Sequence, residues 1–213
     1  MKIRSFYILM SFLLVSFQLS AQSDDAQKIL KDLSDKTNSY DNIKVSFTYT
    51  MDNKAADINE TTNGTLIVSG DKYRLNIAGQ EIISDGNTLW NYMADSEEVQ
   101  VNEAGGDEGF SPNKLLSTYS DDYTSTKDVD IEIEGKKYYQ LLLKPRVDNP
   151  GVEFVRLIVN IEEMHLKSFI MYDFDGNVFT YDIKQFIPNT DIPANSFIFV
   201  TEDYPNVEVI DMR

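Results

Sequence analysis

The feature that most constrains the fold is a period-two alternation of apolar and polar residues, repeated along most of the chain. In residues 45–51, "VSFTYTM", every second side chain is large and apolar, and residues 73–77, "YRLNI", repeat the pattern. Such segments are typical of half-buried strands, and the turn residues between them favour hairpins. We expect an antiparallel meander of roughly ten strands, undivided by repeat or linker. The segments are 45–51, 64–70, 72–78, 81–93, 129–145, 152–163, 165–186 and 195–200.

Asp-Gly-Asn sequences mark the turns most clearly, because glycine and asparagine tolerate a positive φ. Asp85-Gly86-Asn87 is followed at once by Trp90, the only tryptophan, so this turn fixes where that side chain points. We expect further turns at Glu134-Gly135, Asn149-Pro150-Gly151 and Asp175-Gly176-Asn177.

Two segments depart from the strand pattern. Residues 24–40 carry apolar side chains at helical spacing, which predicts an amphipathic helix. Residues 102–123 begin as an acidic, glycine-containing loop, and Ser111-Pro112 then opens a short helical stretch. A small apolar helix on a long loop suits a lid over a binding site. The predicted lid residues are Pro112, Leu115, Leu116 and Tyr119.

The first 21 residues have the pattern of a secretory signal peptide, with Lys2 and Arg4 before an apolar core and small residues at its end. We expect cleavage after Ala21 and one domain over residues 22–213, exported to the periplasm. The chain has no cysteine, and its formal charge of −16 would become −18 without Lys2 and Arg4. Such a charge disfavours nucleic acid and anionic membranes, and favours a soluble monomer.

Residues that could carry chemistry are few. His165 is the only histidine, lacks a neighbouring nucleophile motif, and is expected to be a turn residue. Residues 173–184 begin like a calcium loop, but Lys184 stands where the loop needs glutamate, so a hairpin turn is favoured. The carboxylates mostly alternate with apolar residues, as a solvated strand face would, which disfavours a glycosidase pair. We therefore predict no catalytic residues, no metal and no cofactor.

The apolar residues that share a face suggest a binding surface. Twelve phenylalanines, twelve tyrosines and seven methionines exceed what about two helices cover. Either a second sheet completes the core or a hydrophobic cavity remains. We expect the helix and the lid to cover a concave apolar surface. Its predicted residues are Phe47, Tyr49, Leu66, Val68, Tyr73, Leu75, Ile77, Trp90 and Tyr92.

Residues 64–101 resemble the LolA family of periplasmic lipoprotein carriers. The family shows a Gly-x-Leu strand, an aromatic-Arg strand and an "sDGktlW-x-Y" hairpin, and the chain has "SDGNTLWNY" at residues 84–92. "SPNKLL" resembles the family's lid region, and residues 186–211 resemble its C-terminal end. The matching positions of the first stretch are Gly64, Leu66, Tyr73, Arg74, Asp85, Gly86, Thr88, Leu89, Trp90, Tyr92 and Val99.

The resemblance implies an unclosed antiparallel barrel of about 10–11 strands with a helical lid. It implies a non-enzymatic carrier that shields lipoprotein acyl chains between the inner and outer membranes. Its implied partners are acylated lipoproteins or another lipid, an inner-membrane release transporter and an outer-membrane acceptor. The chain departs from the family at Ser69-Gly70-Asp71, where an Arg-Pro with a lid-latching arginine often stands. A lipid-sensing or lipoprotein-sensing module on the same fold is the alternative, and an enzyme ranks third.

Overall fold

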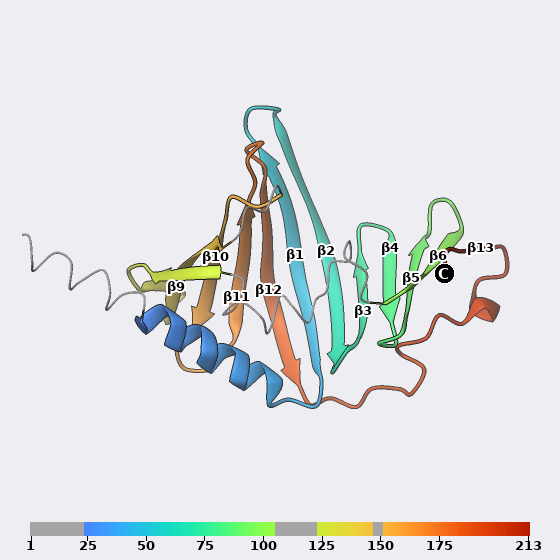
Figure 1. Cartoon of the computed structure of the whole chain (residues 1–213), viewed down its shortest axis with the longest axis horizontal. Coiled ribbons are helices and arrows are strands. Elements are labelled where there is room, and N and C mark those ends of the chain that lie inside the picture. Colours follow the sequence, from blue (N-terminus) through green and yellow to red (C-terminus); the bar gives the residue numbers. More distant parts are fainter. Residues whose placement is uncertain (1–23, 105–122, 147–150) are drawn as a thin grey trace, which may run out of the picture.

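One large curved sheet with a helix packed against it forms the described part of the molecule (Figure 1). The computed structural model describes residues 24–104, 123–146 and 151–213. Thirteen strands lie in the order β13-β6-β5-β4-β3-β2-β1-β12-β11-β10-β9-β7, with β8 paired to β9 beside this path. Their bounds are β1 Ile43–Asn53, β2 Ile58–Ser69, β3 Lys72–Ile77, β4 Gln80–Ser84, β5 Thr88–Met93, β6 Glu98–Glu103, β7 Tyr123–Lys127, β8 Ile131–Ile133, β9 Lys136–Pro145, β10 Phe154–Asn160, β11 Leu166–Tyr172, β12 Val178–Pro188 and β13 Glu208–Asp211.

Two meanders meet at β1, which pairs with β2 on one side and with β12 on the other. Strands β2 to β6 follow one another outward from β1, while β9 to β12 return toward it from the opposite edge. All pairs are antiparallel except β13, which runs parallel to β6. Among the described strands β13 and β7 do not pair, so the sheet is an unclosed, mainly antiparallel barrel. The expected fold class is confirmed.

The turns follow from local chemistry that the sequence signals. Between β4 and β5, the Asp85 carboxylate accepts hydrogen bonds from the backbone N–H groups of Asn87 and Thr88, at 2.8 and 2.7 Å. Gly86 takes a φ of +94°, which glycine adopts without a Cβ clash. The β8–β9 turn at 134–135 likewise places both residues at positive φ, as a two-residue hairpin requires.

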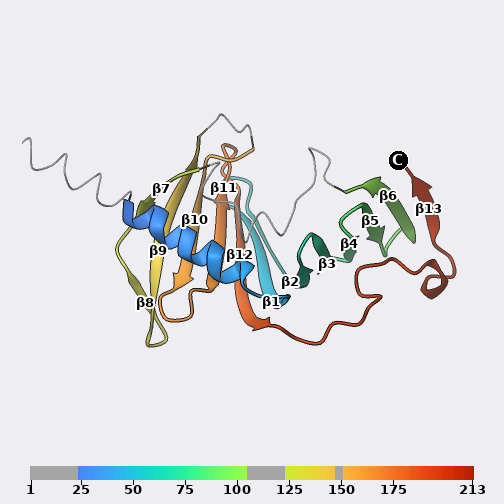
Figure 2. The ribbon, with the colours of Figure 1, turned by 60° about the horizontal axis from the view of Figure 1, so that its bottom comes forward.

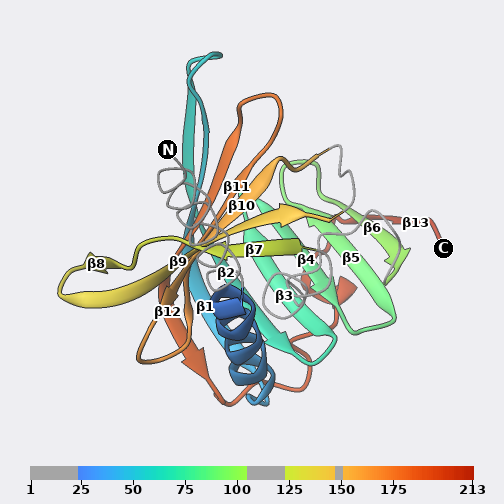
Figure 3. The same cartoon turned by 60° about the vertical axis from the view of Figure 1, so that its left-hand side comes forward.

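The N-terminal helix is described over residues 24–38 and ends in a turn at 39–40, close to the expected end at 40. It lies across one face of the sheet, over the β9–β12 half (Figure 2). The sheet curls around it, with β3–β6 and β8–β9 lying to either side (Figure 3). Its buried face contains Ala26, Ile29, Leu30, Leu33 and Thr37, as the helical spacing predicts.

Three details differ from the sequence prediction. The described strands number thirteen rather than about 10–11, because β6, β7 and β13 lie outside the segments with clear alternation. Residues 195–200, expected to form a strand, have turns and irregular structure. Phe197 and Phe199 there are nevertheless buried, so their alternation reflects packing of an irregular segment and not a strand. The second-sheet alternative is also wrong for the described residues, whose strands all belong to one sheet.

Candidate functional site

The sheet face against which the helix packs, called here the inner face, is apolar across most of its width. Directly opposed residues of neighbouring strands project from the same face, so the strand register defines that face. On one side of β1 the apolar row is Val45, Leu66, Leu75 and Ile82. On the other side, a second apolar row further along β1 is Tyr49, Tyr181, Phe169, Leu157 and Leu141.

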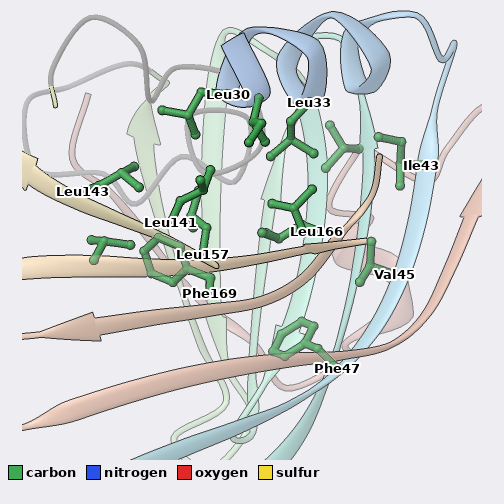
Figure 4. Close-up of a cluster of buried hydrophobic side chains, with 14 of the residues drawn as sticks. Leu30, Leu33, Ile43, Val45, Phe47, Leu141, Leu143, Leu157, Leu166 and Phe169 are labelled. Carbon is green, nitrogen blue, oxygen red and sulfur yellow. The ribbon is translucent and has the colours of Figure 1, made fainter. Parts of the chain in front are cut away.

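The helix covers only part of this inner face. Leu30 and Leu33 point from the helix toward the sheet, and both are 2% exposed (Figure 4). Leu141, Leu143 and Leu157 on the sheet are fully buried in the same cluster. Each buried leucine contributes about 1.5–3 kcal/mol, so this region is the structural core of the domain.

Beyond the helix the inner face continues as a half-buried apolar lining. Part of this lining lies on β1, β11 and β12, and the rest lies on β2 to β5. Half-buried apolar side chains next to a closed core can contact an apolar ligand without any unfolding of the protein. The residues of this lining are Tyr49, Leu66, Ile77, Ile82, Leu89, Met171 and Tyr181.

The tyrosines of the inner face are uncharged at physiological pH. Burial raises the pKa of Tyr181 to about 12, with the neighbouring Tyr49 adding to the effect. Burial also raises the pKa of Tyr49 and of Tyr73. The Tyr49 and Tyr181 rings lie 5.0 Å apart between centroids, so these phenols add aromatic surface and no charge.

Glycine at position 64 is required by the packing of Phe47 on this face. Phe47 and Gly64 are directly opposed on β1 and β2. A Cβ on Gly64 would lie 2.3 Å from the nearest ring atom of Phe47. The ring therefore lies over the glycine, which brings a large aromatic side chain against the backbone of β2.

Polar side chains end the apolar lining at β5 and β6. Asn91 opposes Ile82 on one side and Gln100 on the other, so both amides project from the inner face. The Gln100 amide donates to Glu98 over 2.8 Å. The Asn91 Oδ1 atom is buried and has no hydrogen-bond partner among the described residues. The apolar row that runs through Leu75 and Ile82 thus ends at β4, and amide side chains continue it on β5 and β6.

Trp90 and Tyr92 do not share this face, and the prediction of one surface containing all nine residues was wrong for them. Trp90 opposes Ile83, and Ile83 alternates with Ile82, so Trp90 projects from the outer face. There both aromatics pack around Ile83 beneath Phe199 of the C-terminal segment. Alternation shows which residues of one strand share a face, but the β4–β5 turn sets which of the two sets faces inward.

The other seven predicted residues do lie together on the inner face. Phe47, Val68, Tyr73 and Leu75 are buried in the core cluster, and Tyr49, Leu66 and Ile77 pack against it. Whether they contact a ligand stays a prediction. The predicted lid residues Pro112, Leu115, Leu116 and Tyr119 lie outside the described residues, as do the signal peptide and Asn149-Pro150.

Sequence reasoning missed the contribution of β9 to β12 to the inner face. Phe169, Met171 and Tyr181 extend the lining, and their alternation in residues 165–186 was visible. What the sequence lacked was the pairing of β12 with β1, which brings this second meander beside the first.

A polar network holds the outer face where the C-terminal segment crosses β3 and β4. The Arg74 guanidinium and the Tyr204 hydroxyl each donate to the Glu81 carboxylate over 2.7 Å. Burial opposes ionisation of Glu81, but these donated bonds outweigh it and hold the pKa of its carboxyl below the usual range. Burial and the Glu81 carboxylate raise the pKa of Tyr204 to about 12. The network is structural: it fastens the segment to the sheet.

The residues with possible chemistry have structural surroundings. His165 stacks on Phe186, with 4.0 Å between ring centroids, and its Nε2 lies 2.7 Å from the Tyr40 hydroxyl. Asp173 accepts from the backbone N–H groups of Asp175 and Asn177, forming the β11–β12 turn. Within residues 24–104, 123–146 and 151–213, no group of three or more His, Asp or Glu side chains is arranged to hold a metal. No helix in these ranges has the length and apolar character needed to cross a bilayer.

Comparison with known proteins gives a family match. Residues 38–200 match the family described as "Outer membrane lipoprotein carrier protein LolA". An outer-membrane lipoprotein carrier protein of Shewanella baltica (strain OS155) is 27% identical over 206 residues, covering 92% of this chain and 90% of the relative. One from Halorhodospira halophila is 26% identical over 154 residues, covering 71% of each chain. The crystal structure of an uncharacterized conserved protein from Thermus thermophilus superposes with a TM-score of 0.56. It has 12% identity and covers 87% of this chain and 98% of its own, so it supports the fold alone.

Proposed function

The chain belongs to the LolA family of outer membrane lipoprotein carrier proteins, and we propose on this basis that it carries acylated lipoproteins between two membranes. The acyl chains lie against the inner face of the sheet, which shields them from water during transfer. The protein performs no reaction, and it works in the periplasm as a monomer after loss of residues 1–21. An inner-membrane transporter loads it, and an outer-membrane acceptor receives the cargo.

The observation that carries this proposal is the half-buried apolar lining next to the closed core. Leu66, Ile77, Ile82 and Leu89 extend the inner face beyond the helix, and they are flanked by uncharged side chains. Shielding an acyl chain needs apolar area more than directional contacts, because each buried methylene contributes about 0.8 kcal/mol.

A titration with fatty-acyl ligands of increasing chain length tests the proposal. Two further carbons should tighten binding about tenfold until the lining is fully covered. Affinity should change little with salt, since the contact is apolar. Calorimetry is the suitable readout, because Trp90 lies on the outer face and is not expected to report binding. Binding that depends on the headgroup and not on the chain would favour the sensing alternative.

A charge placed on the lining gives a matched test within the protein. Leu89→Glu should abolish acyl binding, because a desolvated carboxylate in an apolar site is costly. Gln185→Glu is the control, since Gln185 is exposed on β12 and opposes Ser46 on the outer face. Equal binding by the two variants would argue against the inner face as the site.

A further inference from the structure

The long hairpin of β1 and β2 leaves part of one strand edge unpaired. β2 spans Ile58–Ser69, but β3 pairs with it only from Gly64 to Ser69. Residues 58–63 have β1 on one side and no strand on the other in the described part of the sheet. Figure 1 shows β1 and β2 rising beyond the end of β3 and β4. A free strand edge is a template for an added strand.

A cavity of about 460 Å³ lies beside this edge, in the range of known ligand sites. Strand β2 forms one wall, the tip of the β3–β4 hairpin forms the floor, and β5 closes the far side. We call this space the notch. Its polar lining includes Thr62, Asn63, Thr65, Asn76, Gln80 and Glu81.

The free edge is held in place before any ligand arrives. At the hairpin tip, the side-chain Oδ1 of Asn53 accepts from the backbone N–H groups of Ala55 and Ala56 at 3.1 and 3.0 Å. The Asn53 amide also donates to Asn177 in the β11–β12 turn over 2.7 Å. A preorganised edge lowers the entropy lost when a partner strand pairs with it.

The notch adjoins the apolar inner face. Gly64 and Ile77 line the notch, and they are directly opposed on β2 and β3. Ile77 also packs against the core cluster, and Phe47 covers the inner side of Gly64. A molecule with an acyl chain on the inner face could therefore place the polar segment next to that chain in the notch.

We propose that the notch binds an extended peptide by strand addition along residues 58–63, and that this peptide is the segment following the acylated residue of a lipoprotein. The identity of the peptide rests on the proposed carrier function. Backbone N–H and C=O groups of the free edge supply the hydrogen bonds, so the contact accepts many sequences. Glu60 on the edge favours uncharged or basic peptides over acidic ones.

The test compares three probes by calorimetry: palmitate, palmitoyl-Gly-Ser-Gly-Ser-Gly-Ser, and the acetylated hexapeptide at high concentration. The acyl-peptide should bind at least tenfold more tightly than palmitate. Backbone N-methylation of every peptide residue should remove this gain, because it removes all the donors that strand pairing could use. Amide hydrogen exchange should slow within residues 58–63 with the acyl-peptide and not with palmitate.

Two tryptophan variants localise the effect. Asn76 is exposed on β3 and lines the notch, so Asn76→Trp should lower acyl-peptide affinity to that of palmitate while leaving palmitate binding within twofold. Lys72→Trp, at the other exposed end of β3, should leave both affinities within twofold.

The outcomes separate this inference from the carrier proposal. Equal affinities for acyl-peptide and palmitate, insensitivity to N-methylation, or protection elsewhere would overturn strand addition while leaving the carrier function intact. If neither acylated probe binds, the carrier proposal fails. In that case the acetylated hexapeptide alone tests strand addition. Slower amide hydrogen exchange within residues 58–63 in its presence would support peptide binding, and unchanged exchange would overturn it.

Discussion

In the β9–β12 half of the sheet the N-terminal helix covers the inner face, whereas in the β3–β6 half the C-terminal segment covers the outer face. The first arrangement fully buries Leu141 and Leu157 on the inner side. The second fully buries Ile83 on the outer side and leaves Ile82 and Leu89 half-buried on the inner side. Among the described residues, the helix and the C-terminal segment thus cover opposite faces of the sheet.

This difference assigns separate tasks to the two halves. The helix-covered half holds the fold together through closed apolar packing. The other half gains part of its stability from outer-face contacts, and its inner face is only half-buried around Ile82 and Leu89, where an apolar ligand can add contacts. Since a sheet strand exposes alternate residues on each face, one sequence can serve stability and binding at adjacent positions such as Ile82 and Ile83.

The largest expected effect comes from two identical truncations, one in each half. Leu157→Ala should lower the free energy of unfolding by about 2–5 kcal/mol, because a fully buried leucine leaves a cavity. Leu89→Ala should cost about 1 kcal/mol, since the side chain is half-buried. Urea unfolding measures both.

Acyl binding by the same two variants should show the reverse order. Leu89→Ala should weaken palmitate binding several-fold, and folded Leu157→Ala should bind nearly as the parent does. If the two variants lost similar amounts of stability and similar amounts of palmitate affinity, the two halves would not have separate roles in folding and binding.

The second effect concerns the junction between the halves, where Phe47 lies over Gly64. Gly64→Ala should destabilise the protein by about 1–3 kcal/mol, because the added methyl group overlaps the ring. Phe47→Leu removes the ring, so the double variant Phe47→Leu/Gly64→Ala should lose less than the two single variants together. Additive losses in urea unfolding would contradict direct packing of the ring on the glycine.

How far the sequence predicted this arrangement can be judged from particular residues. The helix face, the turns at 85–87, 134–135 and 175–177, and the alternating strands before residue 188 were readable, since each depends on residues close in the chain. The inward placement of Tyr73 and Leu75 was also readable. The outward placement of Trp90 was not, because it depends on the β4–β5 register and on Phe199, more than a hundred residues away. The notch was equally hidden, since it arises from unequal lengths of β2 and β3.

A third effect tests the cover of the outer face through pH. The folded-state pKa of Glu81 lies below its usual value, so its contribution to stability is present above the unfolded value of about 4.3 and is lost as the pH falls through the folded value. Glu81→Gln should lower the free energy of unfolding by about 1 kcal/mol at pH 7. The difference in this free energy between variant and parent should narrow below about pH 4. Glu202→Gln, at an exposed position, should show no such difference. If the difference in the free energy of unfolding persisted unchanged to pH 3, an ionised Glu81 in the network with Arg74 and Tyr204 would be contradicted.

The smallest effect concerns the polar end of the inner face, where Asn91 is the one side chain on β5 with a buried acceptor that lacks a partner in the described structure. A buried unpaired carbonyl oxygen is costly, and leucine has a similar volume. Asn91→Leu should therefore stabilise the protein by up to about 1 kcal/mol in urea unfolding. The change also extends the apolar row from Ile82 by one strand, about 4.8 Å. If the β3–β6 half binds acyl chains on its inner face, the variant should hold a longer chain, so affinity should keep rising with chain length beyond the parent's limit. A gain in stability with an unchanged chain-length limit would place the bound chain elsewhere on the inner face, under the β11–β12 side of the lining.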